Sequence, residues 1–296
     1  MFKKNVLTQL LKLSEELSNR LSYYTVFHPS SLDSIFGGLH NTRKTGRGEE
    51  FLQFREFKQG DYAKNIDWRK SASSNKLLIR EKEKTVSDNI YIHVDNSESM
   101  LFKSMKSSNN KFFNAHLIAL TLCRIFTRNK EQVFIFNNKL SPIKCSSSIS
   151  NFNVRFLETF KENLFPNVGN FKKNSLCIII SDFFYKKEKL TSLLSQLKKK
   201  SIKGLLMQIL DPAEFDLKFN GNIKLIDMET NSELLISNPA RIRDEYKKNF
   251  FQLTQELSNI CGENQFTFFQ HNTKNNLNEL LNKAIKSILM NKKKID

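Results

Sequence analysis

The part of the sequence that decides the fold is an apolar segment followed by a loop of oxygen-bearing side chains, Ile90-Tyr91-Ile92-His93-Val94-Asp95-Asn96-Ser97-Glu98-Ser99-Met100. The nearly continuous apolar run of its first half is typical of a strand that is covered on both faces, as in a parallel sheet. Its second half has the pattern D-x-S-x-S, which places one carboxylate and two hydroxyl groups where the chain leaves the strand. This stretch therefore predicts a buried strand with a polar loop at its carboxyl end.

From residue 86 to residue 296, short apolar strands alternate with helices. The predicted strands are residues 90–94, 133–136, 176–180, 205–210 and 266–269. The predicted helices are residues 112–127, 153–163, 188–200, 241–259 and 277–290. A hairpin-like insertion is expected at residues 223–236. Alternation of this kind predicts a doubly wound α/β domain, in which helices cover both faces of a parallel sheet to give three layers, α/β/α.

Residues 1–85 have a different pattern and are expected to form a smaller N-terminal extension. Leucines at helical spacing predict a helix at residues 7–23 that packs one face on the rest of the protein. Two strand-like segments follow, residues 51–57 and 77–84. Between them lies a polar block, residues 60–69, with the pattern G-D-x-x-x-x-I-D-W.

Two carboxylates fall at the carboxyl ends of predicted strands, where open α/β sheets bind their ligands. Asp95 and Asp182 each end such a strand, and the side chains of Asp95, Ser97 and Ser99 can turn toward a common point. An oxygen-only shell with few protein ligands suits Mg²⁺, which keeps several of its waters. The pattern therefore predicts a site for Mg²⁺ or another divalent ion at these four residues. The alternative is that they bind no metal and only cap the following turns.

The polar block at residues 60–69 is a cluster of polar side chains that has two interpretations. Asp61, Asp67, Trp68 and Arg69 could form a small hydrolytic site or a docking surface. In the structural interpretation, which the sequence favours, Asp67 caps a short helix and Trp68 anchors that helix in the core. Arg69 would then pair with an acid such as Asp61 or Glu83.

The composition narrows the class of protein and its partners. With 47 basic and 30 acidic residues the chain has a formal net charge of +17. A field of that sign favours acidic partners and speeds their approach. No basic stripe interleaved with aromatic residues and no known nucleic-acid motif is present, so nucleic acid is not the expected partner.

The sequence also predicts a cytoplasmic protein without a membrane span. No apolar run reaches the roughly 18 residues that a membrane-spanning helix needs. The first 20 residues have the pattern of an amphipathic helix rather than of a signal peptide. The four cysteines are scattered, which argues against a disulfide scaffold or a zinc ribbon.

Several blocks resemble the bacterial "domain of unknown function 58" family, namely Gly48-Glu49-Glu50-Phe51, Gly60-Asp61, Asn65-Ile66-Asp67-Trp68-Arg69, Ser97-Glu98-Ser99-Met100 and Leu210-Asp211-Pro212-Ala213-Glu214. The D-x-S-x-S loop, together with Ile180-Ser181-Asp182, resembles the metal-ion-dependent adhesion site of von Willebrand factor A-like domains. No clear counterpart of that site's third-loop threonine stands between Ser146 and Thr159. The resemblance extends from about residue 30 to the end of the chain.

This resemblance implies a von Willebrand A-like, Rossmann-type α/β/α fold with a smaller N-terminal extension. It also implies a protein-binding role that is not enzymatic, often beside a MoxR-type AAA+ ATPase that remodels or activates other proteins. Some relatives carry N-terminal membrane helices, and the present chain resembles the soluble ones.

The expected function is therefore a protein-interaction module that is not an enzyme. It would bind a carboxylate of a MoxR-type AAA+ ATPase or of that ATPase's client through a divalent ion. One alternative is a metal-dependent hydrolase that uses Asp95 and Asp182 on a phosphate or nucleic-acid substrate. A second alternative is a metal-free adaptor that binds through residues 61–69. The sequence has no G-x-S-x-G elbow and no glycine-rich phosphate loop, which disfavours an enzyme.

Overall fold

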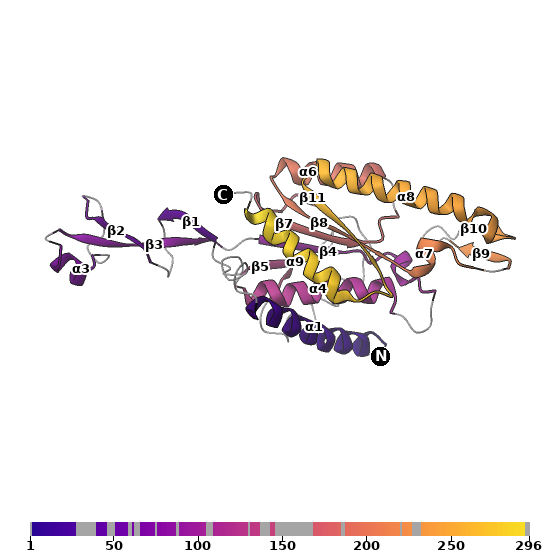
Figure 1. Ribbon diagram of the computed structural model, residues 1–296, viewed down its shortest axis with the longest axis horizontal. Coiled ribbons are helices and arrows are strands. Elements are labelled where there is room, and N and C mark those ends of the chain that lie inside the picture. The colour runs from indigo at the N-terminus through magenta and orange to yellow at the C-terminus, as the bar shows by residue number, and fades with distance from the viewer. Residues whose placement is uncertain are drawn as a thin grey trace.

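The protein consists of an α/β body and a small antiparallel sheet that lies beyond one end of the body (Figure 1). This computed structural model describes residues 2–27, 40–45, 51–58, 61, 66–74, 76–86, 89–104, 109–129, 131–136, 143–145, 168–184, 187–219, 221–226 and 232–293. The helix expected at residues 153–163 lies outside the described residues. So does the whole segment from Ser146 to Thr159, in which the sequence shows no clear third-loop threonine.

Six strands form the central sheet of the body, in the order β11-β8-β7-β4-β5-β6. Along the chain they are β4 (Asn89–Val94), β5 (Gln132–Phe136), β6 (Ile143–Lys144), β7 (Leu176–Ser181), β8 (Lys203–Leu210) and β11 (Phe266–Asn272). Neighbouring strands are parallel, except that β6 pairs with β5 in the antiparallel sense. The five strands expected from the sequence are confirmed to within a few residues, and only the short β6 was not expected.

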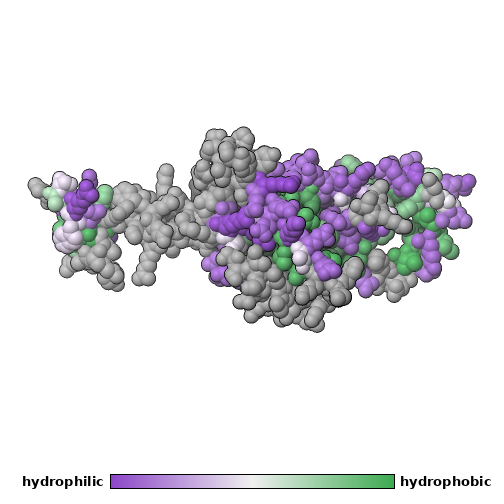
Figure 2. All heavy atoms as spheres, turned by 90° about the horizontal axis from the view of Figure 1, so that it is seen from below, coloured by the Kyte–Doolittle hydropathy of each residue, from purple (hydrophilic) through white to green (hydrophobic). Residues whose placement is uncertain are grey.

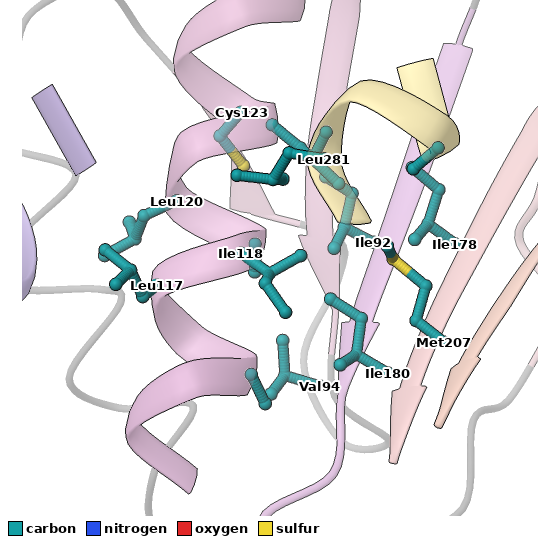
Figure 3. Close-up of a cluster of buried hydrophobic side chains, with 14 of the residues drawn as sticks. Ile92, Val94, Leu117, Ile118, Leu120, Cys123, Ile178, Ile180, Met207 and Leu281 are labelled. Atoms are coloured by element: carbon teal, nitrogen blue, oxygen red, sulfur yellow. The ribbon is translucent and has the colours of Figure 1, made fainter. Parts of the chain in front are cut away.

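Helices cover both faces of this sheet, as the alternating sequence predicted. The helices α4 (Lys111–Arg128) and α9 (Leu277–Lys293) lie on one face, and α6 (Lys187–Lys199) and α8 (Pro239–Glu263) lie on the other. In β7, Ile178 and Ile180 enter the core beneath α4 and α9, whereas Cys177 and Ile179 enter the core beneath α6 and α8. Figure 3 shows the first of these cores, with Ile178, Ile180 and Ile92 facing the helices.

A further helix, α1 (Phe2–Phe27), packs against α4 on the side away from the sheet (Figure 1). Leu10 of α1 is fully buried in the core of the body, and Arg124 Nε of α4 donates to Ser14 Oγ of α1 at 3.0 Å. Because α1 covers it, α4 is buried nearly all round. The helix expected at residues 7–23 is confirmed, and its partner is the α/β body.

The small sheet has three antiparallel strands in the order β1-β3-β2. They are β1 (His40–Thr45), β2 (Phe51–Glu56) and β3 (Leu78–Val86), and a short helix, α3 (Trp68–Ala72), lies between β2 and β3 in the chain. The sequence predicted β2 and β3 and missed β1, whose residues show no alternation of apolar and polar side chains. The small sheet lies at the amino end of β4, so it is remote from the carboxyl edge of the central sheet (Figure 1).

Gly204 marks a close approach of three strands in the central sheet. It stands opposite Cys177 of β7 and Phe266 of β11. A Cβ atom at this position would lie 1.7 Å from the carbonyl oxygen of Cys177 and 2.8 Å from the ring of Phe266. The backbone of β8 therefore packs where a side chain would otherwise be, which only glycine allows.

At the carboxyl end of β8 the chain forms a short helix and then a hairpin. The helix is α7 (Pro212–Asp216), which the sequence analysis did not predict. The hairpin strands are β9 (Ile223–Ile226) and β10 (Glu233–Ile236), as the sequence predicted. The residues of the hairpin turn, 227–231, lie outside the described ranges. In the part of the chain that the structure describes, none of the helices combines the length and the apolar character that a membrane span requires.

Candidate functional site at the carboxyl edge of the sheet

The strand order of the central sheet reverses between β4 and β7, because the chain adds strands outward from these two in opposite directions. In open α/β sheets, ligands bind at the carboxyl ends of such a pair of strands. The loops that follow β4 and β7 begin with Asp95 and Asp182. The backbone N–H of Asp95 donates to the carbonyl oxygen of Ile180 at 2.9 Å, which ties the two strand ends together. Both carboxylates expected from the sequence thus lie at one edge of the sheet.

Hydrogen bonds link three oxygen atoms in a chain at this edge. The hydroxyl groups of Ser97 and Ser99 share a hydrogen bond of 2.9 Å, and Ser99 Oγ donates to Asp182 Oδ2 at 2.8 Å. In an octahedral Mg²⁺ shell, whose bonds are about 2.1 Å long, neighbouring oxygens are about 3.0 Å apart. The distances from Ser99 Oγ to Ser97 Oγ and to Asp182 Oδ2 are close to that separation.

Asp95 lies one hydrogen bond behind this group and positions it. Its Oδ1 accepts from the backbone N–H of Ser97 at 2.8 Å, and its Oδ2 accepts from the hydroxyl of Ser181 at 2.6 Å. The hydroxyl oxygen of Ser181 accepts in turn from the backbone N–H of Phe183 at 3.0 Å. Asp95 therefore joins the loop after β4 to the end of β7 and fixes the position of Ser97.

A buried lysine completes the site. Lys111, the first residue of α4, donates from Nζ to Asp182 Oδ2 at 2.8 Å and to Glu214 Oε1 at 2.6 Å. Its side chain is only 1% exposed, and the rings of Phe102 and Phe184 lie 5.9 and 5.5 Å from the ammonium. Burial alone would lower the pKa of Lys111, but the carboxylates of Asp182 and Glu214 outweigh it and raise that pKa. The lysine is therefore held as an ammonium ion.

Glu214 is positioned by the cap of α7. Asp211 directly follows β8 and accepts from the backbone N–H of Ala213 at 2.9 Å, while Glu214 Oε2 accepts from the backbone N–H of Asp211 at 2.7 Å, which is a capping box. The hydroxyl of Tyr246 in α8 donates to the carbonyl oxygen of Glu214 at 2.6 Å. Burial raises the pKa of Glu214, and the ammonium of Lys111 opposes part of that shift.

We call these residues the carboxyl-edge cluster: Asp95, Ser97, Ser99, Lys111, Asp182 and Glu214. Within the described ranges, there is no group of three or more histidine, cysteine, aspartate or glutamate side chains that could hold a metal ion. Serine hydroxyls would therefore have to complete the shell of any ion bound here. The hydroxyl oxygens of Ser97 and Ser99 and the carboxylate oxygen of Asp182 are of the hard type that a small cation such as Mg²⁺ prefers.

The residues singled out in the polar block lie at the other end of the molecule, around α3 (Figure 1). Asp67 caps α3 by accepting from the backbone N–H of Lys70 at 3.0 Å, which confirms the predicted cap. Asp61 accepts from both terminal nitrogens of Arg55 at 2.6 Å, so the predicted pairing of Asp61 with Arg69 is wrong. Arg55 holds the pKa of Asp61 down at about 2, with help from the backbone N–H of Lys58.

Trp68 does not anchor α3 in the core, and that prediction is wrong. The side chain of Trp68 is 65% exposed. The reason is that α3 has only five residues and lies against a small three-stranded sheet, where no second layer among the described residues covers the indole. The alternative partner predicted for Arg69, Glu83, has a side chain outside the described part of the structure.

Sequence reasoning missed two members of the carboxyl-edge cluster, Lys111 and Glu214. The signal for Glu214 was present, because Asp211-Pro212-Ala213-Glu214 after a strand has the pattern of a capping box. Lys111 gave a weaker signal, as a charged residue at the start of a largely apolar helix. Nothing in the spacing indicated that it would meet Asp182, which is 71 positions away in the chain.

Comparison with known proteins identifies the family of the chain. A solved aerotolerance-related membrane protein from Bacteroides fragilis NCTC 9343, with multiple mutations to serines, is 13% identical with a TM-score of 0.41, over 68% of this chain and 100% of that one. The conserved hypothetical protein BatB from Bacteroides thetaiotaomicron is 12% identical with a TM-score of 0.35, over 70% of this chain and 98% of that one. No curated protein matches the chain. The family model "Protein of unknown function DUF58" matches residues 53–255, which is more than half of the chain. The chain therefore belongs to the DUF58 family.

Proposed function

We propose that this protein is an interaction module, not an enzyme, that binds an acidic group of a partner protein through a divalent ion at the carboxyl-edge cluster. The observation that carries the proposal is that Ser99 Oγ lies 2.9 Å from Ser97 Oγ and 2.8 Å from Asp182 Oδ2. The switch point between β4 and β7 supports it, because a von Willebrand A-like, Rossmann-type domain would have its adhesion site there.

In this proposal the side chains have different tasks. Ser97, Ser99 and Asp182 hold the ion, for which Mg²⁺ is the first candidate, and Asp95 keeps Ser97 in place. The ion would supply an open coordination position for the partner's carboxylate. Two or three protein oxygens leave room for such a ligand, because Mg²⁺ takes six.

Exposed apolar side chains around the carboxyl edge support a protein as the partner. Leu101 and Phe184, in the two loops of the cluster, are 49% and 45% exposed. Ile226, Leu234 and Leu235 of the hairpin are exposed to 53%, 59% and 76%. Figure 2 shows hydrophobic residues gathered toward the end of the molecule where Figure 1 places α7 and the hairpin. An apolar surface next to a polar anchor is typical of protein-binding sites.

The partner that we propose is a MoxR-type AAA+ ATPase, or a client of that ATPase, in the cytoplasm. The resemblance described above supports this choice, and the net charge of +17 would speed the approach of an acidic partner.

The test is capture of the purified ATPase by the purified full chain, with and without Mg²⁺ and a chelator. Ser99→Ala and Asp95→Ala should reduce capture at least tenfold, and chelator should do the same to the unchanged chain. The matched control is Ser192→Ala, a surface serine of α6, which should capture normally. Capture that neither chelator nor Asp95→Ala alters would refute the metal-mediated function.

A second candidate is a metal-free adaptor that docks through α3. The observation that favours it is the 65% exposure of Trp68, on a helix fixed by the Asp67 cap. Exposed aromatic residues on rigid elements are frequent anchors of protein interfaces. In that case Trp68→Ala would abolish capture while Ser99→Ala and chelator would leave it unchanged.

A further inference from the structure

We propose that the ammonium of Lys111 competes with the divalent ion for the carboxylate of Asp182. The ammonium binds Asp182 while no ion is present and must release it when the ion enters. This inference rests on the proposed function only in assuming that the ion binds at Ser97, Ser99 and Asp182.

The competition follows from the contacts of one atom. Asp182 Oδ2 accepts from Ser99 Oγ and from Lys111 Nζ, each at 2.8 Å. The same oxygen is the one negatively charged ligand among the three oxygens proposed to hold the ion. The other oxygen of this carboxylate, Oδ1, accepts from the backbone N–H of Phe184 at 3.3 Å. An ion that takes Oδ2 therefore meets the lysine there.

The two cations cannot share that oxygen without strong repulsion. An ion bonded at about 2.1 Å to Oδ2 would lie less than about 5 Å from an ammonium that bonds the same atom. Asp182 and Lys111 are 2% and 1% exposed, so water screens this repulsion poorly. One of the two cations has to give up the contact.

Lys111 has a second anchor, which makes the exchange possible. Its ammonium also bonds Glu214 Oε1 at 2.6 Å, and Glu214 is held by the capping box of α7. When an ion takes Asp182, the ammonium keeps this second carboxylate and is not left unpaired. The lysine therefore weakens ion binding without preventing it, and the cluster keeps a cation of its own in the absence of metal.

The experiment is titration of Mg²⁺, and separately of Mn²⁺, into the full chain by calorimetry. Lys111→Met, which keeps the length of the side chain and removes its charge, should bind each ion at least tenfold more tightly than the unchanged chain. The matched control is Lys103→Met, an exposed lysine in the loop after β4, which should bind as the unchanged chain does. Equal or weaker binding by Lys111→Met, or no binding by either protein, overturns the inference.

A second variant and a second measurement cover the case in which Lys111→Met does not fold. Lys111→Gln removes the charge and keeps a hydrogen-bond donor, and it should show the same tightening. In the unchanged chain, the nuclear magnetic resonance signal of the Lys111 ammonium should shift as Mg²⁺ is added. A signal that stays in place up to ion saturation overturns the inference.

These results are distinguishable from those that test the function. If Lys111→Met binds ions more tightly but capture of the ATPase ignores chelator, the inference stands and the metal-mediated function fails. If capture of the ATPase depends on Mg²⁺ but Lys111→Met and the unchanged chain bind ions equally, the function stands and the inference fails.

Discussion

The two ends of the molecule each contain a short contact between a basic and an acidic side chain, but in opposite surroundings. At the carboxyl edge, Lys111 and Asp182 are 1% and 2% exposed. In the small sheet, Arg55 and Asp61 are 33% and 20% exposed, with a contact of 2.6 Å. Water can replace the lost partner in the second pair and cannot do so in the first. The buried pair therefore fixes the structure around it, whereas the exposed pair mainly orients a loop.

Asp182→Ala should have the largest effect. Of the two carboxylates that the structure shows on the buried ammonium of Lys111, this variant leaves only Glu214. Removing one member of a buried ion pair typically costs about 3–5 kcal/mol. We expect the free energy of unfolding in urea at pH 7 to fall by about 3 kcal/mol. The control is Glu256→Ala, which removes an exposed pair with Lys187 and should leave that free energy unchanged. Equal losses in both variants would contradict the comparison.

As the pH falls, the α/β body should lose stability at a higher pH than the one at which the Arg55–Asp61 pair of the small sheet titrates. Burial lowers the pKa of His116 and of His271 to about 4, whereas histidine in an unfolded chain titrates near pH 6.5. Because the folded pKa is the lower one, the stability that these residues contribute is complete above about pH 6.5 and is lost as the pH falls toward 4. Urea midpoints measured from pH 8 to pH 4 should therefore decline below pH 6.5. A flat profile down to pH 5 would contradict this expectation.

Asp61 should titrate lower still, and with a smaller effect on stability. Its pKa is lowered to about 2, against about 3.9 in an unfolded chain, first by the hydrogen bonds from Arg55. The stabilisation is thus present above about pH 4 and is lost as the pH falls through about 2. Carbon resonance of the carboxyl group should give a midpoint of about 2, and Arg55→Gln should move it back toward 4. A midpoint near 4 in the unchanged chain would show that the contact is not maintained in water.

Trp68→Ala should have the smallest effect on stability, because the indole is 65% exposed. We expect no measurable change in the free energy of unfolding. Capture of a partner is the informative measurement: it stays normal if the carboxyl edge is the binding site and is lost if α3 is. A large loss of stability would mean that the indole is buried after all.

The body of this protein is predictable from its sequence because its signals are local. The apolar run of β7, Cys177-Ile178-Ile179-Ile180, is long enough to require cover on both faces, and the helices that follow each strand provide it. The polar ends of β4 and β7 were predictable for the same reason, since Asp95 and Asp182 directly follow their strands.

The parts that sequence reasoning missed depend on contacts between distant segments. Lys111 meets Glu214 across 103 positions, and only the sheet order places α4 and α7 next to each other. Trp68 was placed in the core because a tryptophan buries a large apolar area in most proteins. A five-residue helix at the end of a three-stranded sheet offers it no such place.

Gly204 has a consequence for how this protein tolerates change. Because position 204 has no side chain, Phe266 of β11 and the backbone of β7 can both pack close to β8. Even a methyl group there would push β7, β8 and β11 apart. Asp182 stands at the far end of β7, and a displaced β7 would carry that carboxylate away from Ser99. A library that randomises position 204 should therefore yield glycine almost exclusively, although this position touches none of the functional groups.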